Sequence, residues 1–106
     1  MFVSIVLDPG STDSARSMVN ILAHTGFKKI QRACWENMSL SESDLANLKK
    51  EIDRVTDYYD NVRIYQFPVD GMFVITELKE KRWKRCQMKA QAVNQNKGTG
   101  PNPVKR

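Results

Sequence analysis

The chain opens with an almost unbroken apolar run, FVSIVL at residues 2–7, which stops at Asp8, Pro9 and Gly10. A short run of this kind is typical of a strand that is covered on both faces. Proline and glycine then end the strand, because both favour turns over a regular ladder. We therefore expect a central strand that finishes on a carboxylate.

Two helices are predicted where apolar residues recur at helical spacing. Candidate N-cap residues at 11–13 precede the first helix, and Gly26 is placed to end it. Its apolar positions are Ala15, Met18, Val19 and Leu22. The second helix begins at Ser41, with Asp44 three residues later, as in a capping box. Its apolar stripe consists of Leu45, Leu48, Ile52 and Val55.

The remaining segments are predicted to be extended. Residues 26–38 contain β-formers without a helical period, so we expect one strand or two short strands there. Residues 61–67 alternate, which places Val62 and Ile64 on one face of a strand. A turn at residues 68–71 then leads into a last short strand, MFVIT.

This order of elements predicts an α+β fold in residues 1–78: an antiparallel sheet with two helices on one face, as in the ferredoxin-like split βαβ sandwich. Residues 79–91 contain good helix formers and predict a short basic C-terminal helix. Residues 92–106 are rich in Asn, Gln, Gly, Pro and Lys and predict a disordered tail.

Charge is distributed unevenly along the 106 residues. Between Lys79 and Arg106 there are nine basic residues and one acid, which gives +8; because the whole chain carries +5, residues 1–78 carry −3. Such asymmetry favours contact with a polyanion, nucleic acid above all. A solvated tail that serves solubility is the alternative.

Length and composition restrict the class of protein. The chain has room for a single domain. It contains no apolar run long enough for a membrane span and no signal-peptide pattern. Its two cysteines, Cys34 and Cys86, lack metal-ligand spacing, which suggests reduced thiols and a cytoplasmic location.

Three motifs in residues 1–78 together resemble the CRISPR-associated protein 2 family, the small partner of the CRISPR integrase. The first strand ends in Asp8 within IVLDPG, a glycine and an extended segment with Gln31 and Trp35 follow the first helix, and a later strand reads DNVRIY at 60–65. The resemblance implies a ferredoxin-like homodimer that bridges integrase dimers (CRISPR-associated protein 1) and binds double-stranded DNA during spacer acquisition, a part of antiviral defence.

The resemblance also implies a role for Asp8. In the family the matching aspartates of two subunits lie near the dimer axis and can bind Mg²⁺, with Mn²⁺ as a substitute, and some members are metal-dependent endonucleases. Two carboxylates with water suit Mg²⁺, and bound water can attack a phosphodiester. Asp8 is thus a candidate metal ligand and catalytic residue, while Asp-Pro-Gly by itself is explained by turn chemistry. His24, the one histidine, could serve as a general base or simply interact with a helix end.

Basic residues are candidates for contacts with nucleic acid or a partner protein, and each could also be a solvated surface residue. They are Arg16, Lys28, Lys29, Arg32, Lys79, Lys81, Arg82, Lys84 and Arg85. Trp83 could stack on a base or anchor the last element. The three tyrosines, Tyr58, Tyr59 and Tyr65, are expected as core or dimer contacts more than as a stacking platform.

Three functions therefore remain open. The first is a DNA-binding scaffold, the second a metal-dependent phosphodiesterase that uses Asp8 from both subunits, including a toxin-like ribonuclease. The third is a ferredoxin-like sensor of a small ligand, which requires a pocket with convergent polar groups. No motif in the sequence marks such a pocket.

Overall fold

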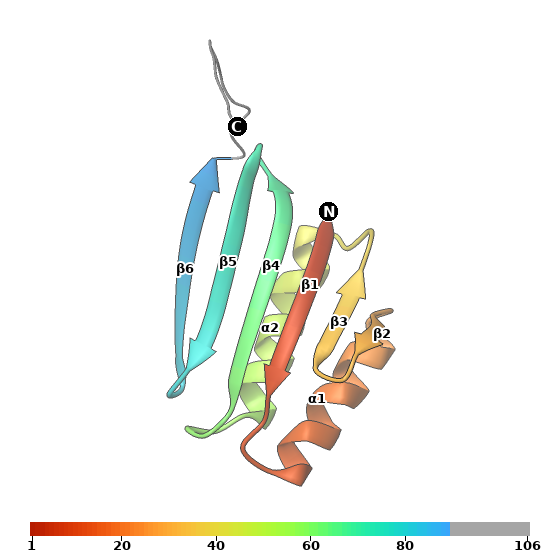
Figure 1. Ribbon diagram of the computed structural model, residues 1–106, viewed down its shortest axis with the longest axis vertical. Helices are drawn as coiled ribbons and strands as arrows, with labels where there is room; N and C mark the ends of the chain where they lie inside the picture. The colour runs from red at the N-terminus through yellow and green to blue at the C-terminus, as the bar shows by residue number, and fades with distance from the viewer. Residues whose placement is uncertain (90–106) are drawn as a thin grey trace, which may run out of the picture.

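The computed structural model describes residues 1–89, which form six strands and two helices (Figure 1). In chain order the elements are β1 (Phe2–Asp8), α1 (Thr12–His24), β2 (Lys28–Gln31), β3 (Cys34–Asn37), α2 (Glu42–Val55), β4 (Asn61–Val69), β5 (Met72–Lys79) and β6 (Arg82–Lys89).

The strands form one sheet in the order β2-β3-β1-β4-β5-β6, in which every neighbouring pair is antiparallel. Both helices lie against one face of this sheet (Figure 1). From β1 to β4 the elements run β-α-β-β-α-β, and their strands lie in the order β2-β3-β1-β4. This is the split βαβ, ferredoxin-like arrangement, so the predicted fold class is confirmed. Strands β5 and β6 extend the sheet beyond β4.

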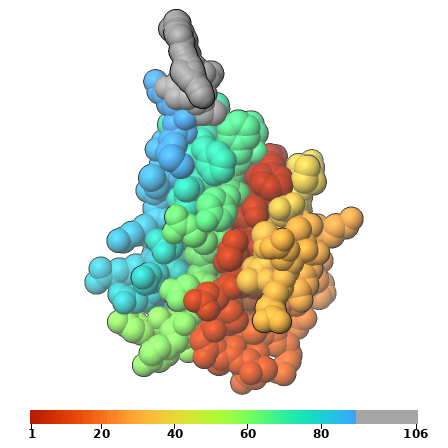
Figure 2. Space-filling view, viewed as in Figure 1, coloured from red at the N-terminus to blue at the C-terminus, as the bar shows by residue number. Residues whose placement is uncertain are grey.

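Strand β1 is central, as predicted, but only one of its faces is covered by the described residues. Val3 and Ile5 are fully buried under the helices, whereas Val6 on the other face is 36% exposed. No helix or strand of residues 1–89 lies over this second face, which we call the open face (Figure 2). The expectation that both faces of the strand are covered is therefore wrong for the described part of the protein.

Both helices begin where the sequence predicts, and α1 also ends as predicted, just before Gly26. Ser11 caps α1 by accepting a hydrogen bond from the backbone N–H of Ser14 at 3.1 Å, and Gly26 follows the helix with a positive φ of 84°. Ser41 caps α2 in the same way through the N–H of Asp44, also at 3.1 Å. Within residues 1–89, neither helix has the length and apolar character needed to cross a membrane.

The extended segment at 26–38 forms two paired strands, β2 and β3, which are connected by a turn at residues 32–33. The β4–β5 hairpin is longer than predicted, because β4 continues through Pro68 and β5 continues to Lys79. Asp70 and Gly71 connect the two strands, and both have positive φ, as a tight two-residue hairpin requires.

The predicted basic helix at 79–91 is wrong, because residues 82–89 form a strand, β6, that pairs with β5 along its whole length. Residues 80 and 81 make a two-residue turn, and both have positive φ. The segment contains good helix formers, but helix propensity is a weak preference. The free edge of β5 supplies a full ladder of hydrogen bonds, which a helix with two large apolar residues, Trp83 and Met88, could not match by packing. The predicted tail at 92–106 lies outside the described residues.

Candidate nucleic-acid interface

Strand β6 divides the basic C-terminal cluster between the two faces of the sheet, because side chains alternate along a strand. Trp83 and Arg85 lie opposite buried residues of β5 and therefore point toward the helices. Arg82 and Lys84 lie on the open face. The cluster that the sequence predicts as one unit is thus two separate basic surfaces.

The open-face surface consists of Lys79, Arg82 and Lys84 near the β5–β6 turn, and all three are exposed. Lys79 lies opposite Arg82, and Lys84 lies opposite Glu77. Glu77 is also 3.7 Å from the guanidinium of Arg63 on β4. The Glu77 carboxylate therefore has both Arg63 and Lys84 as neighbours and cannot neutralise all of these cations, so the open-face surface keeps an excess of positive charge.

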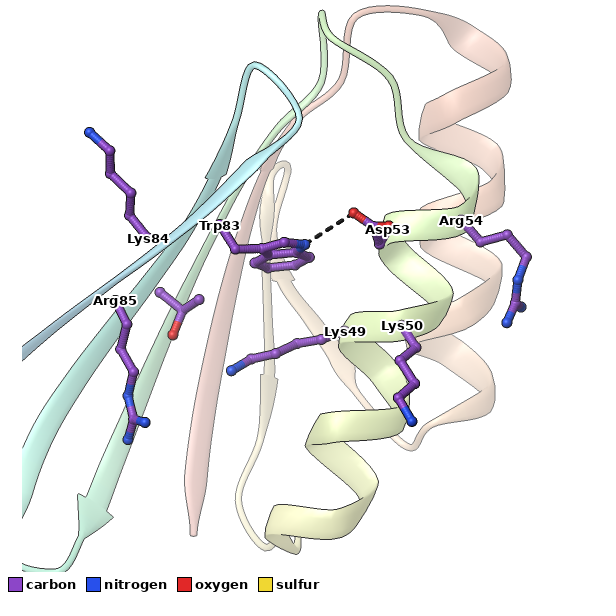
Figure 3. A pocket seen from close by; sticks show the side chains of 8 residues that line it. Lys49, Lys50, Asp53, Arg54, Trp83, Lys84 and Arg85 are labelled. Carbon is purple, nitrogen blue, oxygen red and sulfur yellow. Dashed lines mark hydrogen bonds between the residues drawn. The ribbon is translucent and has the colours of Figure 1, made fainter.

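On the helix side, Trp83 joins β6 to α2. Its indole Nε1 donates a hydrogen bond to Oδ1 of Asp53 at 3.1 Å (Figure 3). Lys81 Nζ lies 3.3 Å from the same oxygen and also donates to the backbone carbonyl of Asp53. Trp83 packs on the hydrophobic core. These contacts support the anchoring role of Trp83.

A groove of about 680 Å³ opens between α2 and the β5–β6 hairpin. Lys49 of α2 extends across it toward the sheet, and Arg85 faces it from β6 (Figure 3). Burial lowers the pKa of Lys49, and the positive charge of Arg85 lowers it further. The groove is the second basic surface, and the sequence did not indicate it because its residues come from separate elements.

The other predicted contact residues lie elsewhere. Lys28 and Lys29 are exposed on β2, and Arg32 follows in the β2–β3 turn, at the opposite edge of the sheet from β6. Five interstrand spacings separate the two edges, or roughly 24 Å. Arg16 lies on α1, where its guanidinium is 3.3 Å from Asp13. The predicted contacts therefore do not form one site in a single protomer.

Asp8 is the last residue of β1 and is exposed on the open face, opposite Asn61 of β4. Within residues 1–89, no group of three or more His, Cys, Asp and Glu side chains comes together in a metal-binding arrangement. One carboxylate by itself is a poor Mg²⁺ site, because proteins usually hold this ion with one or two carboxylates together with water and the phosphates of a substrate. A metal site at Asp8 would require a second protomer.

The loop after Asp8 is held by a different aspartate, Asp60, whose side chain is fully buried. Its Oδ1 accepts a hydrogen bond from the Gly10 N–H at 2.7 Å, and its Oδ2 accepts one from the Asp57 N–H at 2.8 Å. Burial alone would raise the pKa of Asp60, but these backbone hydrogen bonds hold the pKa below its usual value. Sequence reasoning missed this role, although a lone aspartate directly before a strand was a possible signal.

Gly10 also approaches the α2–β4 loop closely. A Cβ at this position would lie 2.6 Å from Cβ and 2.7 Å from the carbonyl oxygen of Tyr59. The Asp-Pro-Gly sequence is therefore explained by a loop that must pass close to Tyr59 and bind Asp60. This supports the turn interpretation of residues 8–10.

The single histidine and the tyrosines show no catalytic arrangement among the described residues. His24 is exposed at the end of α1, and its Nδ1 lies 2.8 Å from the carbonyl oxygen of Asn20 one turn earlier. Tyr58 and Tyr59 are 55% and 73% exposed, so of the two expected roles, core or dimer contact, the core role is wrong for them and the dimer contact stays a prediction. Tyr65 is partly buried on the open face, and its hydroxyl accepts a hydrogen bond from Nε of Arg63 at 2.9 Å.

The end of the open face farthest from the β5–β6 turn is apolar. Phe2 pairs with Phe67, Phe73 pairs with Met88, and the rings of Phe67 and Phe73 are 5.7 Å apart. Phe67 is 37% exposed and Met88 is 46% exposed. We call these four residues the apolar patch. Clustered exposed side chains of this kind are typical of an interaction surface.

Comparisons with protein families, with curated proteins and with solved structures found no match to this chain. Its function therefore has to be inferred from its own residues and their arrangement.

Proposed function

We propose that this protein is a homodimeric scaffold that binds double-stranded DNA without sequence preference and acts with the CRISPR integrase during spacer acquisition. The observation that carries the DNA-binding part is the exposed row of Lys79, Arg82 and Lys84 on the open face at the end of the sheet. The assignment to CRISPR adaptation depends on the resemblance of residues 1–78 and on no other observation.

The spacing along β6 suits a phosphate backbone. Arg82 and Lys84 are two residues apart on the same face of a strand, which corresponds to about 6.7 Å. One DNA strand rises about 3.4 Å along the helix axis per phosphate, and the helical twist brings the distance between neighbouring phosphates to roughly 6.5 Å, so the two side chains match neighbouring phosphates. Contacts of this type position a protein on DNA and carry no base specificity.

A homodimer is supported by the apolar patch. Two sheets can pack face to face about 10 Å apart when side chains from both faces interdigitate. The patch and the basic row lie at opposite ends of the open face, since Phe73 and Met88 pair at one end of the β5–β6 hairpin and Lys79 and Arg82 pair at the other. Dimerisation at one end would leave the basic rows accessible to DNA.

The test is a salt titration of binding to a labelled DNA duplex by fluorescence anisotropy. In the double variant Arg82→Gln/Lys84→Gln we expect weaker binding and a log-log salt slope that is shallower by about two units, because two phosphate contacts are lost. The control is Lys50→Gln/Arg54→Gln, which removes two charges from α2 that point away from the sheet (Figure 3). If the double variant binds with unchanged affinity and slope, the β6 interface is wrong.

Point substitutions are preferable to shortening the chain. Truncation after Glu77 was the obvious way to remove the basic segment. That cut would also delete β6 and the end of β5, so a loss of binding could not be distinguished from a loss of the sheet.

A metal-dependent phosphodiesterase is a second candidate, favoured by the exposure of Asp8 on the open face. Asp8 lies at the other end of β1 from Phe2 of the apolar patch, so this candidate needs two copies that meet at the Asp8 end of the open face, where each could contribute a carboxylate. Spacer acquisition in cells with the wild type, Asp8→Ala or a deletion separates the candidates. A scaffold predicts normal acquisition with Asp8→Ala and none with the deletion. Failure of a folded Asp8→Ala dimer would favour the enzyme, and a Mg²⁺ titration would then follow.

A further inference from the structure

The groove between α2 and the β5–β6 hairpin has the size of a small-molecule site. Its volume of about 680 Å³ falls within the usual range for ligand pockets, roughly 300–1,000 Å³. A phosphate group alone would leave most of this space empty. The side chains of Trp83, Asp53 and Lys49 border it in Figure 3.

Five basic residues line this groove, and two that lack an acid of their own among the described residues are Lys49 and Arg85. Lys49 and Arg85 come from opposite sides of it, and no ion pair of residues 1–89 includes either of them. The one acid that lines the groove, Asp53, already interacts with Lys81 and Trp83. An anion between Lys49 and Arg85 would relieve their mutual repulsion, which otherwise disfavours the charged form of Lys49.

A buried hydroxyl without a partner provides an independent sign of a ligand. Thr76 of β5 lines the groove and is 3% exposed, yet its Oγ1 makes no hydrogen bond to any described residue. Oε1 of Gln66, which is 5% exposed, is likewise unpartnered within residues 1–89. It lines an adjoining hollow that shares Lys49 and Arg85 with the groove. Buried polar groups normally make at least one hydrogen bond, so we expect each of these two atoms to have a partner when a ligand is bound.

Trp83 supplies a large aromatic surface beside these polar groups. It lines the groove and is held in place by its hydrogen bond to Asp53. Stacking on an aromatic side chain is a common way to hold a nucleobase without reading its identity. Cations, a hydroxyl donor and an indole thus converge on one space of suitable volume.

We propose that the groove binds a nucleoside monophosphate. The phosphate lies between Lys49 and Arg85, the hydroxyl of Thr76 donates a hydrogen bond to a phosphate oxygen, and the base lies against Trp83. Lys49, Thr76, Trp83 and Arg85 lie on the helix side of the sheet, whereas the proposed DNA interface uses the open face. Lys84 belongs to that interface and also borders the groove.

Isothermal titration calorimetry of the full chain with AMP tests the proposal. Lys49→Met should weaken binding by about tenfold or more, the effect of losing one charge-assisted hydrogen bond. Lys29→Met is the matched control, because Lys29 is an exposed lysine on β2, at the opposite edge of the sheet, and does not line the groove. That variant should bind AMP within about twofold of the wild type, as expected for an exposed charge outside the site.

Thr76→Val gives a second and sharper signature. Valine has nearly the shape of threonine and removes the unpartnered hydroxyl, so the protein without ligand should melt at the same or a higher temperature. Binding of AMP should nevertheless weaken by about fivefold, since one hydrogen bond to the phosphate is lost. A purely structural role for Thr76 would instead change both quantities in the same direction or neither.

Ribose 5-phosphate and adenosine separate the contributions of the two parts of the ligand. Both should bind more weakly than AMP. The proposal is wrong if AMP does not bind at millimolar concentration, if Lys49→Met binds as the wild type does, or if ribose 5-phosphate binds as tightly as AMP. DNA affinity should be unchanged in Thr76→Val, so failure of this proposal and failure of the DNA interface are distinguishable.

Discussion

Trp83 of β6 and Asp53 of α2 are joined by a hydrogen bond of 3.1 Å from the indole Nε1 to the carboxylate Oδ1. This contact connects the edge strand of the sheet to the helix that packs behind it. Trp83 is the only residue of β6 that is partly buried, and all the others are exposed. The attachment of the strand therefore depends on its ladder with β5 and on this one side chain.

Replacement of Trp83 should consequently destabilise the protein. We expect Trp83→Ala to lower the free energy of unfolding by about 3 kcal/mol, because it removes a large side chain that packs on the core. Trp83→Phe keeps an aromatic ring but loses the N–H donor, and we expect it to lower the free energy of unfolding by about 1 kcal/mol. Urea denaturation measures both. Lys84→Ala, the next residue on the opposite face, should change stability by less than about 0.5 kcal/mol. Equal effects at the two positions would contradict the anchoring role.

Asp60 should make stability depend on pH. Its pKa in the folded protein is lowered, so its contribution is fully present above the pKa of the unfolded chain, about 3.9. The contribution is lost as pH falls from there through the folded pKa. We expect Asp60→Asn to lower the free energy of unfolding by about 2 kcal/mol at pH 7, because the amide nitrogen of asparagine cannot accept, which leaves one of the two loop N–H groups without an acceptor. Denaturation at a series of pH values should show this difference shrinking below about pH 4.

Asp13→Asn is the control for that series. Asp13 has a side chain that is 95% exposed and forms only a surface ion pair with Arg16. Its stability difference from the wild type should be small at every pH. If Asp60→Asn behaves in the same way, the carboxylate does not hold the loops together.

Gly10→Ala should test the close approach of the β1–α1 loop to Tyr59. The added methyl group would lie 2.6 Å from Cβ and 2.7 Å from the carbonyl oxygen of Tyr59, too close for any ordinary contact. We expect a loss of about 2 kcal/mol in the free energy of unfolding, typical of overpacking. Gly71→Ala is a useful comparison, because its Cβ would meet nothing within 4 Å and only a φ of 75° opposes it. That variant should lose about 1 kcal/mol. A smaller loss in Gly10→Ala than in Gly71→Ala would contradict the packing argument.

The apolar patch should control the oligomeric state. Met88→Lys places a charge beside Phe73 in the patch, and we expect it to convert a dimer into a monomer, because a buried unpaired charge is costly. Size-exclusion chromatography with light scattering measures the mass. Ile30→Lys is the matched control, since Ile30 is 48% exposed and lies on β2, at the edge of the sheet opposite β6 and away from the patch. A dimer that persists in Met88→Lys would exclude this face as the interface.

Much of the fold followed from local patterns. Ser11, Ser41 and Gly26 mark helix ends through backbone hydrogen bonds and a positive φ, which involve only neighbouring residues. The alternation of Val62 and Ile64 predicted the buried face of β4 correctly for the same reason. Among the candidate site residues, the types were apparent from the sequence but their grouping was not.

The sequence by itself determined the helices, the central strands and the basic character of the segment after β5, because caps, period and charge are properties of adjacent residues. Only the tertiary structure decided that residues 82–89 form a strand, since the free edge of β5 outweighs their helix propensity. It also decided which basic residues share a surface. Lys49, Thr76 and Arg85 come from three elements, and only the packing of α2 on the sheet brings them to one groove.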